Sequence, residues 1–337
     1  MEYRLLGRTG VKVSQLCFGT MSFGAEADEA TSKAMYKRVR DLGINFFDCA
    51  DAYTKGRAEE ILSGLIKGER DDLVITSKCF NNIRGDINSG GGNRRHVAKA
   101  VEDSLKRLGT DRIDVLFMHR FDKEAPLEEV LRGLEDVVRA GKVLYIGASN
   151  YAAWQVAKAL GISDKNNWTR FDVIQPMYNL VKRQAEAEIF PQAMAEGMGV
   201  ITYSPVGGGM LSGKYGPGKR PDQGRIMDQK NYSARYANDW MFDTAGRFTE
   251  FAEKQGLHPV TLGDFFDTFI DYGAFPNFER KVKKLMRRNP RIHTVIMGHT
   301  HLRKVRRFGP NRTYINTGTW TDLISLDIAN LGVNREL

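Results

Sequence analysis

Short runs of hydrophobic and β-branched residues alternate with longer amphipathic segments along the first 205 residues of the chain. Each run suits a strand buried on both faces, and the segments between the runs show helical spacing. The runs begin 28–30 residues apart, with one interval of 40 residues. They are QLCFGTM (15–21), INFFDCA (44–50), LVITSKCF (73–80), IDVLFMHR (113–120), VLYIGASN (143–150), FDVIQPM (171–177) and GVITYSP (199–205).

The segment 94–109 is typical of the predicted helices. Its hydrophobic residues share one helical face: Val97, Ala100, Val101, Leu105 and Leu108. Gly109 predicts the end of this helix, because glycine readily adopts the left-handed conformation of a C-cap. Seven consecutive βα units predict an α/β fold and favour a (β/α)8 TIM barrel over an open doubly wound sheet. No GxGxxG motif follows the first predicted strand, as a dinucleotide-binding open sheet would need.

Two further segments complete the predicted architecture. The sequence YRLLGRTGVKVS at 3–14 predicts a β-hairpin that turns at Arg8, Thr9 and Gly10 and closes the floor of the barrel. Residues 206–245 are rich in glycine and polar side chains, and they predict a long loop.

The composition is that of a globular protein. The 337 residues are 42% hydrophobic, which is enough for a large core and too much for a disordered chain. No run approaches the roughly 18 hydrophobic residues of a transmembrane helix, and the N-terminus lacks the hydrophobic region of a signal peptide. The cysteines, Cys17, Cys49 and Cys79, are odd in number and far apart. We therefore expect a cytoplasmic protein without a disulfide framework and without a membrane segment.

The formal charge of +9 is unevenly distributed. Residues 280–312 contain twelve Lys or Arg and no acidic residue, whereas the first 279 residues carry 37 basic and 38 acidic side chains. The positive excess therefore belongs to a C-terminal segment and not to the predicted barrel. No nucleic-acid-binding module accompanies it, so a specific nucleic-acid partner is not expected.

Polar residues close nearly every predicted strand at its carboxyl end. Any one of them could be a satisfied strand cap, but together they favour a site, because the carboxyl ends of barrel strands carry the chemistry of this architecture. They are Asp48, Lys78, His119, Ser149, Asn150, Gln175, Tyr203 and Ser204.

These motifs resemble those of the aldo-keto reductases. The resemblance is carried by GINFFDCADAY (43–53), ITSKCF, LFMHRFD, YIGASNY, IQPMYNL and ITYSPVGGGMLSGKY (201–215), in that order. It runs from residue 2 to about residue 262 and is closest to the subgroup that includes the potassium-channel β-subunits and related bacterial reductases. The resemblance implies an NADP-dependent oxidoreductase that reduces a small aldehyde or ketone to an alcohol.

The resemblance also implies a catalytic tetrad of Asp48, Tyr53, Lys78 and His119. Tyr53 is the expected general acid, which protonates the carbonyl oxygen as hydride leaves the nicotinamide. Because a tyrosine has an ordinary pKa near 10, it needs a nearby cation to stabilise its anion. Lys78 is that cation in the family pattern, Asp48 holds the lysine, and His119 orients the substrate oxygen.

The expected NADP(H) site extends over the ends of several strands. Ser149, Asn150 and Gln175 match side chains that bind the nicotinamide carboxamide, and Tyr203 matches the aromatic residue that stacks on the ring. Thr20 and Met21 match positions beside cofactor and substrate, although many family members have tryptophan in place of Met21. The pyrophosphate loop is matched by Ser204, Pro205, Leu211, Ser212 and Lys214, with Asp48 also near the cofactor.

The family pattern stops after residue 262. Residues 263–337 instead resemble the C-terminal end of calcineurin-like metallophosphoesterases, through GHTH (298–301) and YINTGTW (314–320). A two-metal site needs further histidine, asparagine and carboxylate ligands, and the chain has no DxH or GNH motif to supply them. His299 and His301 are therefore weak metal candidates, and we expect no metal site. The chain resembles a fusion of a truncated barrel, residues 1–262, with a foreign segment.

Under one hypothesis, the foreign segment supplies the missing eighth strand of the barrel. HTVIMG (293–298) has the pattern of a buried strand and follows an amphipathic helix at 279–288, so it could serve as the eighth strand beside Leu16–Gly19 or Val200–Tyr203. Arg303, Lys304, Arg306 and Arg307 would then lie near the adenosine end of the cofactor, the alternative being a solvated basic face. Three functions stay open: a carbonyl reductase, a cofactor-binding chimera with impaired catalysis, and a metal-dependent phosphoesterase. The sequence leaves the oligomeric state open.

Overall fold

The computed structural model describes residues 1–254, 294–297, 304–307 and 313–316. The chain divides into two compact units, Met1–Pro259 and Val260–Leu337. The first unit contains a seven-stranded parallel sheet whose strands follow one another in chain order. Its strands are β3 (Phe18–Gly19), β4 (Phe46–Asp48), β5 (Val74–Cys79), β6 (Ile113–Met118), β7 (Val143–Ser149), β8 (Phe171–Gln175) and β9 (Gly199–Val200).

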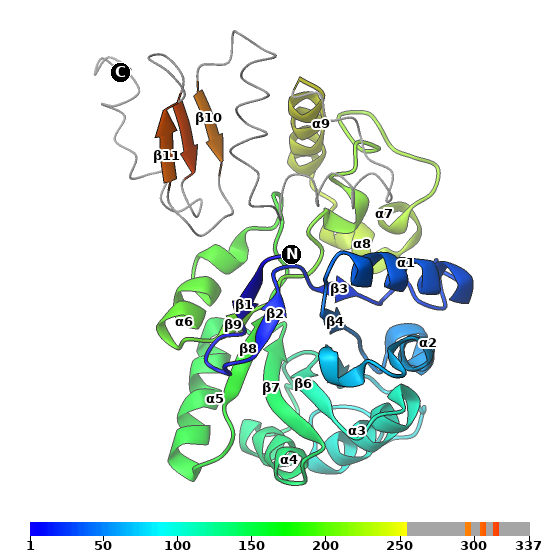
Figure 1. Ribbon diagram of the computed structural model, residues 1–337, viewed down its shortest axis with the longest axis vertical. Helices are drawn as coiled ribbons and strands as arrows, with labels where there is room; N and C mark the ends of the chain where they lie inside the picture. The colour runs from blue at the N-terminus through cyan, green and yellow to red at the C-terminus, as the bar shows by residue number, and fades with distance from the viewer. Residues whose placement is uncertain (255–293, 298–303, 308–312, 317–337) are drawn as a thin grey trace. The chain divides into compact units, whose positions relative to one another are not determined.

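Helices surround this curled sheet, as Figure 1 shows. All seven predicted strands are present and parallel, so the predicted α/β barrel class is confirmed. The surrounding helices are α1 (Glu29–Asp41), α2 (Arg57–Ile66), α3 (Arg94–Leu108), α4 (Leu127–Arg139), α5 (Ala153–Asn166) and α6 (Ile189–Ala195).

Helix α3 shows how the local sequence determines an element. The side chain of Asn93 accepts a hydrogen bond from the backbone N–H of His96 at 2.9 Å and caps the N-terminus. Gly109 ends the helix with a φ of +62°, as its sequence predicted. The predicted apolar face is buried against the barrel, except that Leu105 is only half-buried.

The core of the barrel is filled by inward-facing side chains of the strands and by the N-terminal hairpin. Strands β1 (Tyr3–Leu5) and β2 (Lys12–Ser14) pair antiparallel, which confirms the predicted hairpin. Leu6 and Val13 from the hairpin join one buried cluster with Phe46, Val115 and Val173 from the barrel strands. The hairpin therefore plugs the barrel.

The prediction of an unstructured loop over 206–245 is wrong in part. This region contains η4 (Gly207–Gly209), α7 (Arg225–Asp228), α8 (Lys230–Arg235) and the beginning of α9 (Asp239–Lys254). The helices form because the region carries its own buried cluster, which includes Met210, Tyr215, Ile226, Tyr236 and Phe242. Its glycine content concealed these widely spaced hydrophobic residues.

In the second unit, three short strands form a separate sheet. They are β10 (Thr294–Met297), β11 (Lys304–Arg307) and β12 (Thr313–Asn316). β10 pairs in parallel with β12, and β11 pairs antiparallel with β12. The predicted strand within 293–298 exists, but its predicted pairing with Leu16–Gly19 or Val200–Tyr203 is wrong, because it pairs inside its own unit. The proposed placement of the basic residues at 303–307 beside the cofactor therefore loses its basis.

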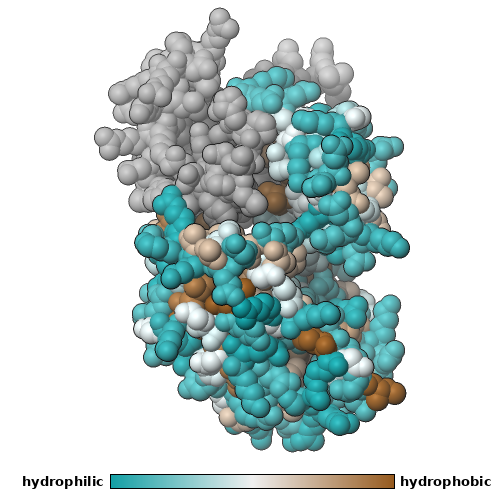
Figure 2. All heavy atoms as spheres, turned by 90° about the vertical axis from the view of Figure 1, so that its right-hand side faces the viewer, coloured by the Kyte–Doolittle hydropathy of each residue, from teal (hydrophilic) through white to brown (hydrophobic). Residues whose placement is uncertain are grey.

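No helix in the described part of the chain is long and apolar enough to span a membrane. The three cysteines are unpaired, and Cys49 and Cys79 are buried. Figure 2 shows that hydrophilic side chains cover most of the described part of one face, where hydrophobic side chains form small separate patches.

Gly147 in β7 provides a test of how tightly the barrel is packed. A Cβ atom at this position would lie 2.5 Å from the Phe117 ring and 2.8 Å from the carbonyl oxygen of Val173. We expect Gly147→Ala to lower the free energy of unfolding by about 1–3 kcal/mol, because both neighbours are fixed in the sheet. Urea unfolding measures the change. Gly161→Ala in α5 is the matched control, because a Cβ atom there meets nothing within 4 Å and alanine favours the helix.

Candidate active site

The four candidate catalytic residues meet at the carboxyl ends of neighbouring strands. Asp48 is the last residue of β4, Lys78 lies near the end of β5, and His119 directly follows β6. Tyr53 begins the short helix η1 (Tyr53–Gly56), in the connection between β4 and α2. Because parallel strands present their carboxyl ends at one side of the sheet, residues distant in sequence become neighbours.

Lys78 is at the centre of this group. Its ammonium donates hydrogen bonds to Asp48 Oδ2 at 2.6 Å, to the carbonyl oxygen of Cys49 at 2.7 Å and to the Tyr53 hydroxyl at 3.1 Å. Lys78 is 1% exposed and Asp48 is 8% exposed. An ammonium has three protons to donate, and these contacts account for all of them. The lysine is therefore held in one position, with its charge beside the tyrosine oxygen.

Asp48 is held on its other side as well. Its Oδ1 accepts hydrogen bonds from the Thr76 hydroxyl at 2.7 Å and from the Gln175 amide at 2.8 Å. Both donors are buried. A buried carboxylate is stable when cations and hydrogen-bond donors satisfy its oxygens, and this one has a lysine and two neutral donors.

The backbone after Tyr53 is unusual. Thr54 and Lys55 adopt φ values of +48° and +54°, a left-handed conformation that is uncommon for residues other than glycine and an outlier for a β-branched side chain. The Thr54 hydroxyl donates a hydrogen bond of 2.9 Å to the carbonyl oxygen of Phe23, which holds the turn in place. Strain of this kind persists only where the surroundings determine it, and here it directly follows Tyr53, whose hydroxyl accepts a hydrogen bond from Lys78.

The electrostatics of the site keep Tyr53 and His119 uncharged near pH 7. Burial raises the pKa of Tyr53 to about 12, and the Lys78 charge opposes that rise. Burial, with Lys78 nearby, lowers the pKa of His119 to about 4. For Lys78 itself, burial alone would lower the pKa, but Asp48 and Tyr53 outweigh burial and raise it. Lys78 is therefore a stable cation beside two neutral groups that can hydrogen bond.

His119 faces Tyr53 and is fixed by a neighbouring amide. The two rings meet edge to face with centroids 6.1 Å apart. The amide nitrogen of Asn81 lies 3.2 Å from Nδ1 of His119. An amide nitrogen can only donate, so this contact makes Nδ1 the acceptor and leaves the proton of the neutral ring on Nε2.

The residues predicted to bind nicotinamide lie together beside the catalytic group. The Ser149 hydroxyl donates to the carbonyl oxygen of Gln175 at 3.1 Å, and the Asn150 amide donates to the carbonyl oxygen of His119 at 2.9 Å. The Tyr203 hydroxyl donates to Oδ1 of Asn150 at 2.6 Å. These bonds join the ends of β7, β8 and β9 into one polar surface that continues to Asp48 through Gln175.

Two residues that follow the ends of these strands have strained backbones. Asn150 and Ser204 adopt φ values of +56° and +58°. Asparagine tolerates the left-handed region better than serine does, and each conformation costs on the order of 1–2 kcal/mol. Strained residues cluster at binding sites, and both of these follow the ends of barrel strands where the sequence predicted the cofactor.

The remaining predicted cofactor residues lie in three different environments. Thr20 is fully buried and donates to the Asp48 carbonyl oxygen through both its N–H, at 2.9 Å, and its hydroxyl, at 3.1 Å. Met21 follows in a turn and is half-buried. In the predicted pyrophosphate loop, Pro205 is exposed, and Leu211 packs on the buried cluster of this region. The Ser212 hydroxyl donates a hydrogen bond to the carbonyl oxygen of Gly209. Lys214 is exposed and forms no ion pair among the described residues.

The metal candidates His299 and His301 lie outside the described residues. Among the residues that the structure does describe, no group of three or more His, Cys, Asp or Glu side chains could hold a metal ion.

Two residues that support the site, Thr76 and Asn81, were not predicted from the sequence. Thr76 holds Asp48, and a signal was available, because Thr76 lies two residues before Lys78 and so faces the same side of β5. Asn81 holds His119. It lies in the loop after β5, where sequence spacing does not determine direction, and only the structure places it.

Comparisons with known proteins agree with this geometry. A model of the aldo/keto reductase family matches residues 15–263. A protein of Oryza sativa subsp. japonica named as a probable voltage-gated potassium channel subunit beta is 37% identical over 265 residues, covering 77% of this chain and 78% of its own length. Versiconal hemiacetal acetate reductase of Aspergillus parasiticus is 37% identical over 290 residues, covering 76% of this chain and 82% of its own. An uncharacterized oxidoreductase of Bacillus subtilis is 39% identical over 226 residues, covering 64% and 69%.

Proposed function

The chain belongs to the aldo/keto reductase family, and on this premise we propose that it reduces an aldehyde or ketone to an alcohol with NADPH. One observation carries the proposal. Buried Lys78, paired with Asp48, donates a hydrogen bond to the Tyr53 hydroxyl beside His119. A cation fixed against a phenol is the arrangement that a tyrosine needs to act as a general acid.

The residues present fit the nicotinamide end of such a cofactor. Ser149, Asn150 and Gln175 bring hydroxyl and amide groups to one surface, and Tyr203 adds an aromatic ring next to Asn150. A carboxamide needs both donors and acceptors, which this set supplies. Lys214, exposed and free of ion pairs among the described residues, suits a phosphate. When bound, the reduced cofactor supplies a hydride to the carbonyl carbon.

The proton chemistry follows from the electrostatics of the site. Tyr53 holds its proton near pH 7, because its pKa is about 12, and His119 can donate a hydrogen bond from Nε2 to the carbonyl oxygen. As negative charge develops on that oxygen, Tyr53 donates its proton, because an alkoxide is far more basic than a tyrosinate. The resulting tyrosinate is stabilised by Lys78 at hydrogen-bond distance.

Two other functions are alternatives to this proposal. The family match ends at residue 263, and the resemblance of residues 263–337 to a metallophosphoesterase rests on GHTH and YINTGTW alone. In the first alternative, the chain is a chimera whose foreign segment impairs turnover and leaves cofactor binding intact. In the second alternative, the chain is a phosphoesterase, which would need metal ligands in addition to His299 and His301.

One assay separates these functions. The folded, monodisperse full chain is mixed with NADPH and a generic aldehyde, and the loss of the absorbance of reduced nicotinamide is followed. Turnover that needs the aldehyde supports the proposal. Quenching of protein fluorescence by NADPH without turnover supports the impaired chimera, and manganese-stimulated hydrolysis of an aryl phosphate supports the phosphoesterase. NADH in place of NADPH tests the cofactor preference.

Asn81 provides a second test of the proposed chemistry. Replacing it with leucine removes the donor to Nδ1 of His119, so the ring can place its proton on either nitrogen. We expect kcat/KM for the aldehyde to fall by about 10-fold to 100-fold, because the carbonyl oxygen loses its fixed donor. The affinity for NADPH should stay the same, which shows that the loop has not collapsed. Unchanged kcat/KM would contradict this role for Asn81.

A further inference from the structure

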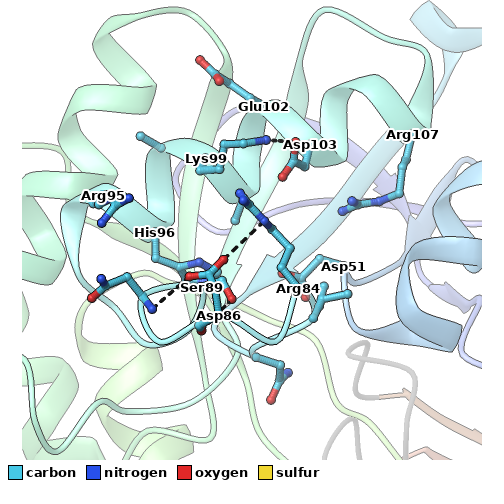
Figure 3. Close-up of a pocket in the computed structure, with 15 residues that line it drawn as sticks. Asp51, Arg84, Asp86, Ser89, Arg95, His96, Lys99, Glu102, Asp103 and Arg107 are labelled. Carbon is cyan, nitrogen blue, oxygen red and sulfur yellow. Dashed lines mark hydrogen bonds and ion pairs between the residues drawn. The ribbon is translucent and has the colours of Figure 1, made fainter.

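Two cavities in the described part of the chain differ in the balance of charge along their walls. The larger cavity, of about 530 Å³, lies between the loop after β5 and helix α3 (Figure 3). Its wall holds four acidic and four basic side chains besides a histidine, and two ion pairs join Lys99 to Asp103 and Arg84 to Asp86. Because these charges balance, this wall favours a ligand of neither charge.

The smaller cavity, of about 300 Å³, lies beside the proposed nicotinamide surface. Asn150 and Tyr203 of that surface form part of its wall. Lys182, from the loop after β8, and Arg235, the last residue of α8, are its charged side chains. Among the described residues, no acidic side chain lines this cavity. A wall with two cations and no carboxylate attracts an anion.

Both cations are accessible to a ligand and are not neutralised by the protein. Each is partly exposed, and neither forms an ion pair within the described part of the chain. The Lys182 ammonium lies 5.8 Å from the ring centre of Tyr236, and the Arg235 guanidinium lies 5.2 Å from that of Tyr232. An aromatic ring orients a cation without cancelling its charge. Both charges therefore remain available to an anion.

The backbone that carries the two cations is fixed by one buried cluster. Val181, beside Lys182, and Tyr236, beside Arg235, are at most 2% exposed and belong to the same cluster. The backbone N–H of Lys182 donates to the carbonyl oxygen of Asn179 at 3.0 Å, and the Asn179 amide donates to the Tyr236 hydroxyl at 3.3 Å. The loop after β8 is thereby tied to α8. Groups that are held in place before binding lose less entropy when a ligand arrives.

The cavity adjoins the catalytic group and lies apart from the predicted pyrophosphate loop. The Asn150 amide in its wall donates to the carbonyl oxygen of His119 at 2.9 Å. The charge of Arg235 acts on Tyr203, where it opposes the rise in pKa that burial causes. None of the residues predicted to bind the pyrophosphate lines the cavity. We therefore expect an anion in this cavity to belong to the substrate and not to the cofactor.

We propose that Lys182 and Arg235 bind a carboxylate of the substrate, so that the chain favours aldehydes with a carboxylate at the end remote from the carbonyl group. This inference rests on the proposed reductase function. Met177 and Ile189 add apolar surface to the same wall, which suits the carbon chain between the two groups. The planar guanidinium matches the two oxygens of a carboxylate, and the lysine adds a second charge.

The turnover test compares two aldehyde acids with their uncharged methyl esters. The acids are para-formylbenzoate and γ-oxobutyrate, which differ in length and stiffness. For at least one acid we expect kcat/KM to exceed that of its ester by about tenfold or more, because charge-assisted hydrogen bonds form only with the acid. The difference should lie mainly in KM, since a remote carboxylate is bound alike in the ground state and the transition state. If both esters are reduced as efficiently as the acids, the proposal is wrong.

Two variants assign this preference to the cavity. Arg235→Gln and Lys182→Gln should each lower kcat/KM for the preferred acid by about fivefold or more and leave that for its ester within about twofold. The matched control is Lys230→Gln, which removes an exposed charge from the same helix outside the cavity and should change neither value. NADPH affinity should be equal in all these proteins. An equal loss for acid and ester, or a loss of NADPH affinity alone, would overturn the proposal.

A binding measurement separates failure of this inference from failure of the proposed function. Isothermal titration calorimetry on the full chain, with and without NADP+, uses the alcohols para-(hydroxymethyl)benzoate and γ-hydroxybutyrate. Their uncharged counterparts are para-methylbenzyl alcohol and butanol. At least one anion should bind about tenfold more tightly than its counterpart, and Arg235→Gln should remove the difference while Lys230→Gln keeps it. If the anions bind in this way and no aldehyde is reduced, the proposed function fails and the carboxylate site stands. If neither anion binds more tightly than its counterpart in either condition, the carboxylate site is wrong.

Discussion

Replacing Tyr53 with phenylalanine should lower kcat for aldehyde reduction by about 10²-fold to 10⁴-fold. The substitution removes one oxygen atom, which among the described residues both accepts a hydrogen bond from Lys78 and carries a proton that can pass to the substrate. The ring remains and keeps its edge-to-face contact with His119. The rate should be measured with saturating NADPH and aldehyde, so that the loss is assigned to kcat and not to binding.

The control for this substitution is Tyr151→Phe. Tyr151 is 3% exposed, and its hydroxyl has no hydrogen-bond partner among the described residues. Losing that hydroxyl removes no hydrogen bond among the described residues, so activity and stability should stay close to those of the parent protein. The affinity of Tyr53→Phe for NADPH should also be unchanged, since no predicted nicotinamide contact involves its hydroxyl. A Tyr53→Phe protein that keeps more than about a tenth of the parent kcat would exclude Tyr53 as the general acid.

The pH profile gives an independent check of the same assignment. Between about pH 5 and pH 9 neither His119, with a pKa of about 4, nor Tyr53, with a pKa of about 12, changes its protonation state. Across that range, kcat/KM of the parent protein should be nearly constant, provided that the substrate itself does not titrate.

The sequence predicted the barrel and the main site residues because both follow from simple periodic rules. Continuous hydrophobic runs at regular intervals define parallel strands, and the polar residue at each carboxyl end must then lie on the same side of the sheet. Asp48, Lys78, His119 and Gln175 were found in this way, and the structure brings them together. Tyr53 needed the family resemblance, since it lies in a short turn that no periodicity describes.

The incorrect predictions have physical reasons as well. The run within 293–298 has the composition of a buried strand, but four residues carry too little information to choose a partner, and β12 supplies one within the same unit. Helix α9 was not predicted, because the segment before it is rich in glycine and this composition indicates a loop. The spacing of Met241, Phe242 and Ala245 places them on one face of a helix and would have predicted it.

Replacing Lys78 with methionine should affect both activity and stability, because this ammonium has two separate roles. As the partner of Asp48 it compensates a buried carboxylate, so its loss should lower the free energy of unfolding by about 3–5 kcal/mol. As the cation beside Tyr53 it stabilises the tyrosinate, so its loss should also reduce kcat by about 10²-fold or more.

The double variant Asp48→Asn/Lys78→Met separates these two roles. With both charges removed, no buried ion is left unpaired, and the asparagine can still contact Thr76 and Gln175, so most of the lost stability should return. Activity should not return, because Tyr53 still lacks the cation that opposes the burial-driven rise of its pKa. Urea unfolding and the NADPH assay are measured on the same preparations. If the double variant regains activity together with stability, the lysine serves the fold alone, and the tyrosinate must be stabilised by another group.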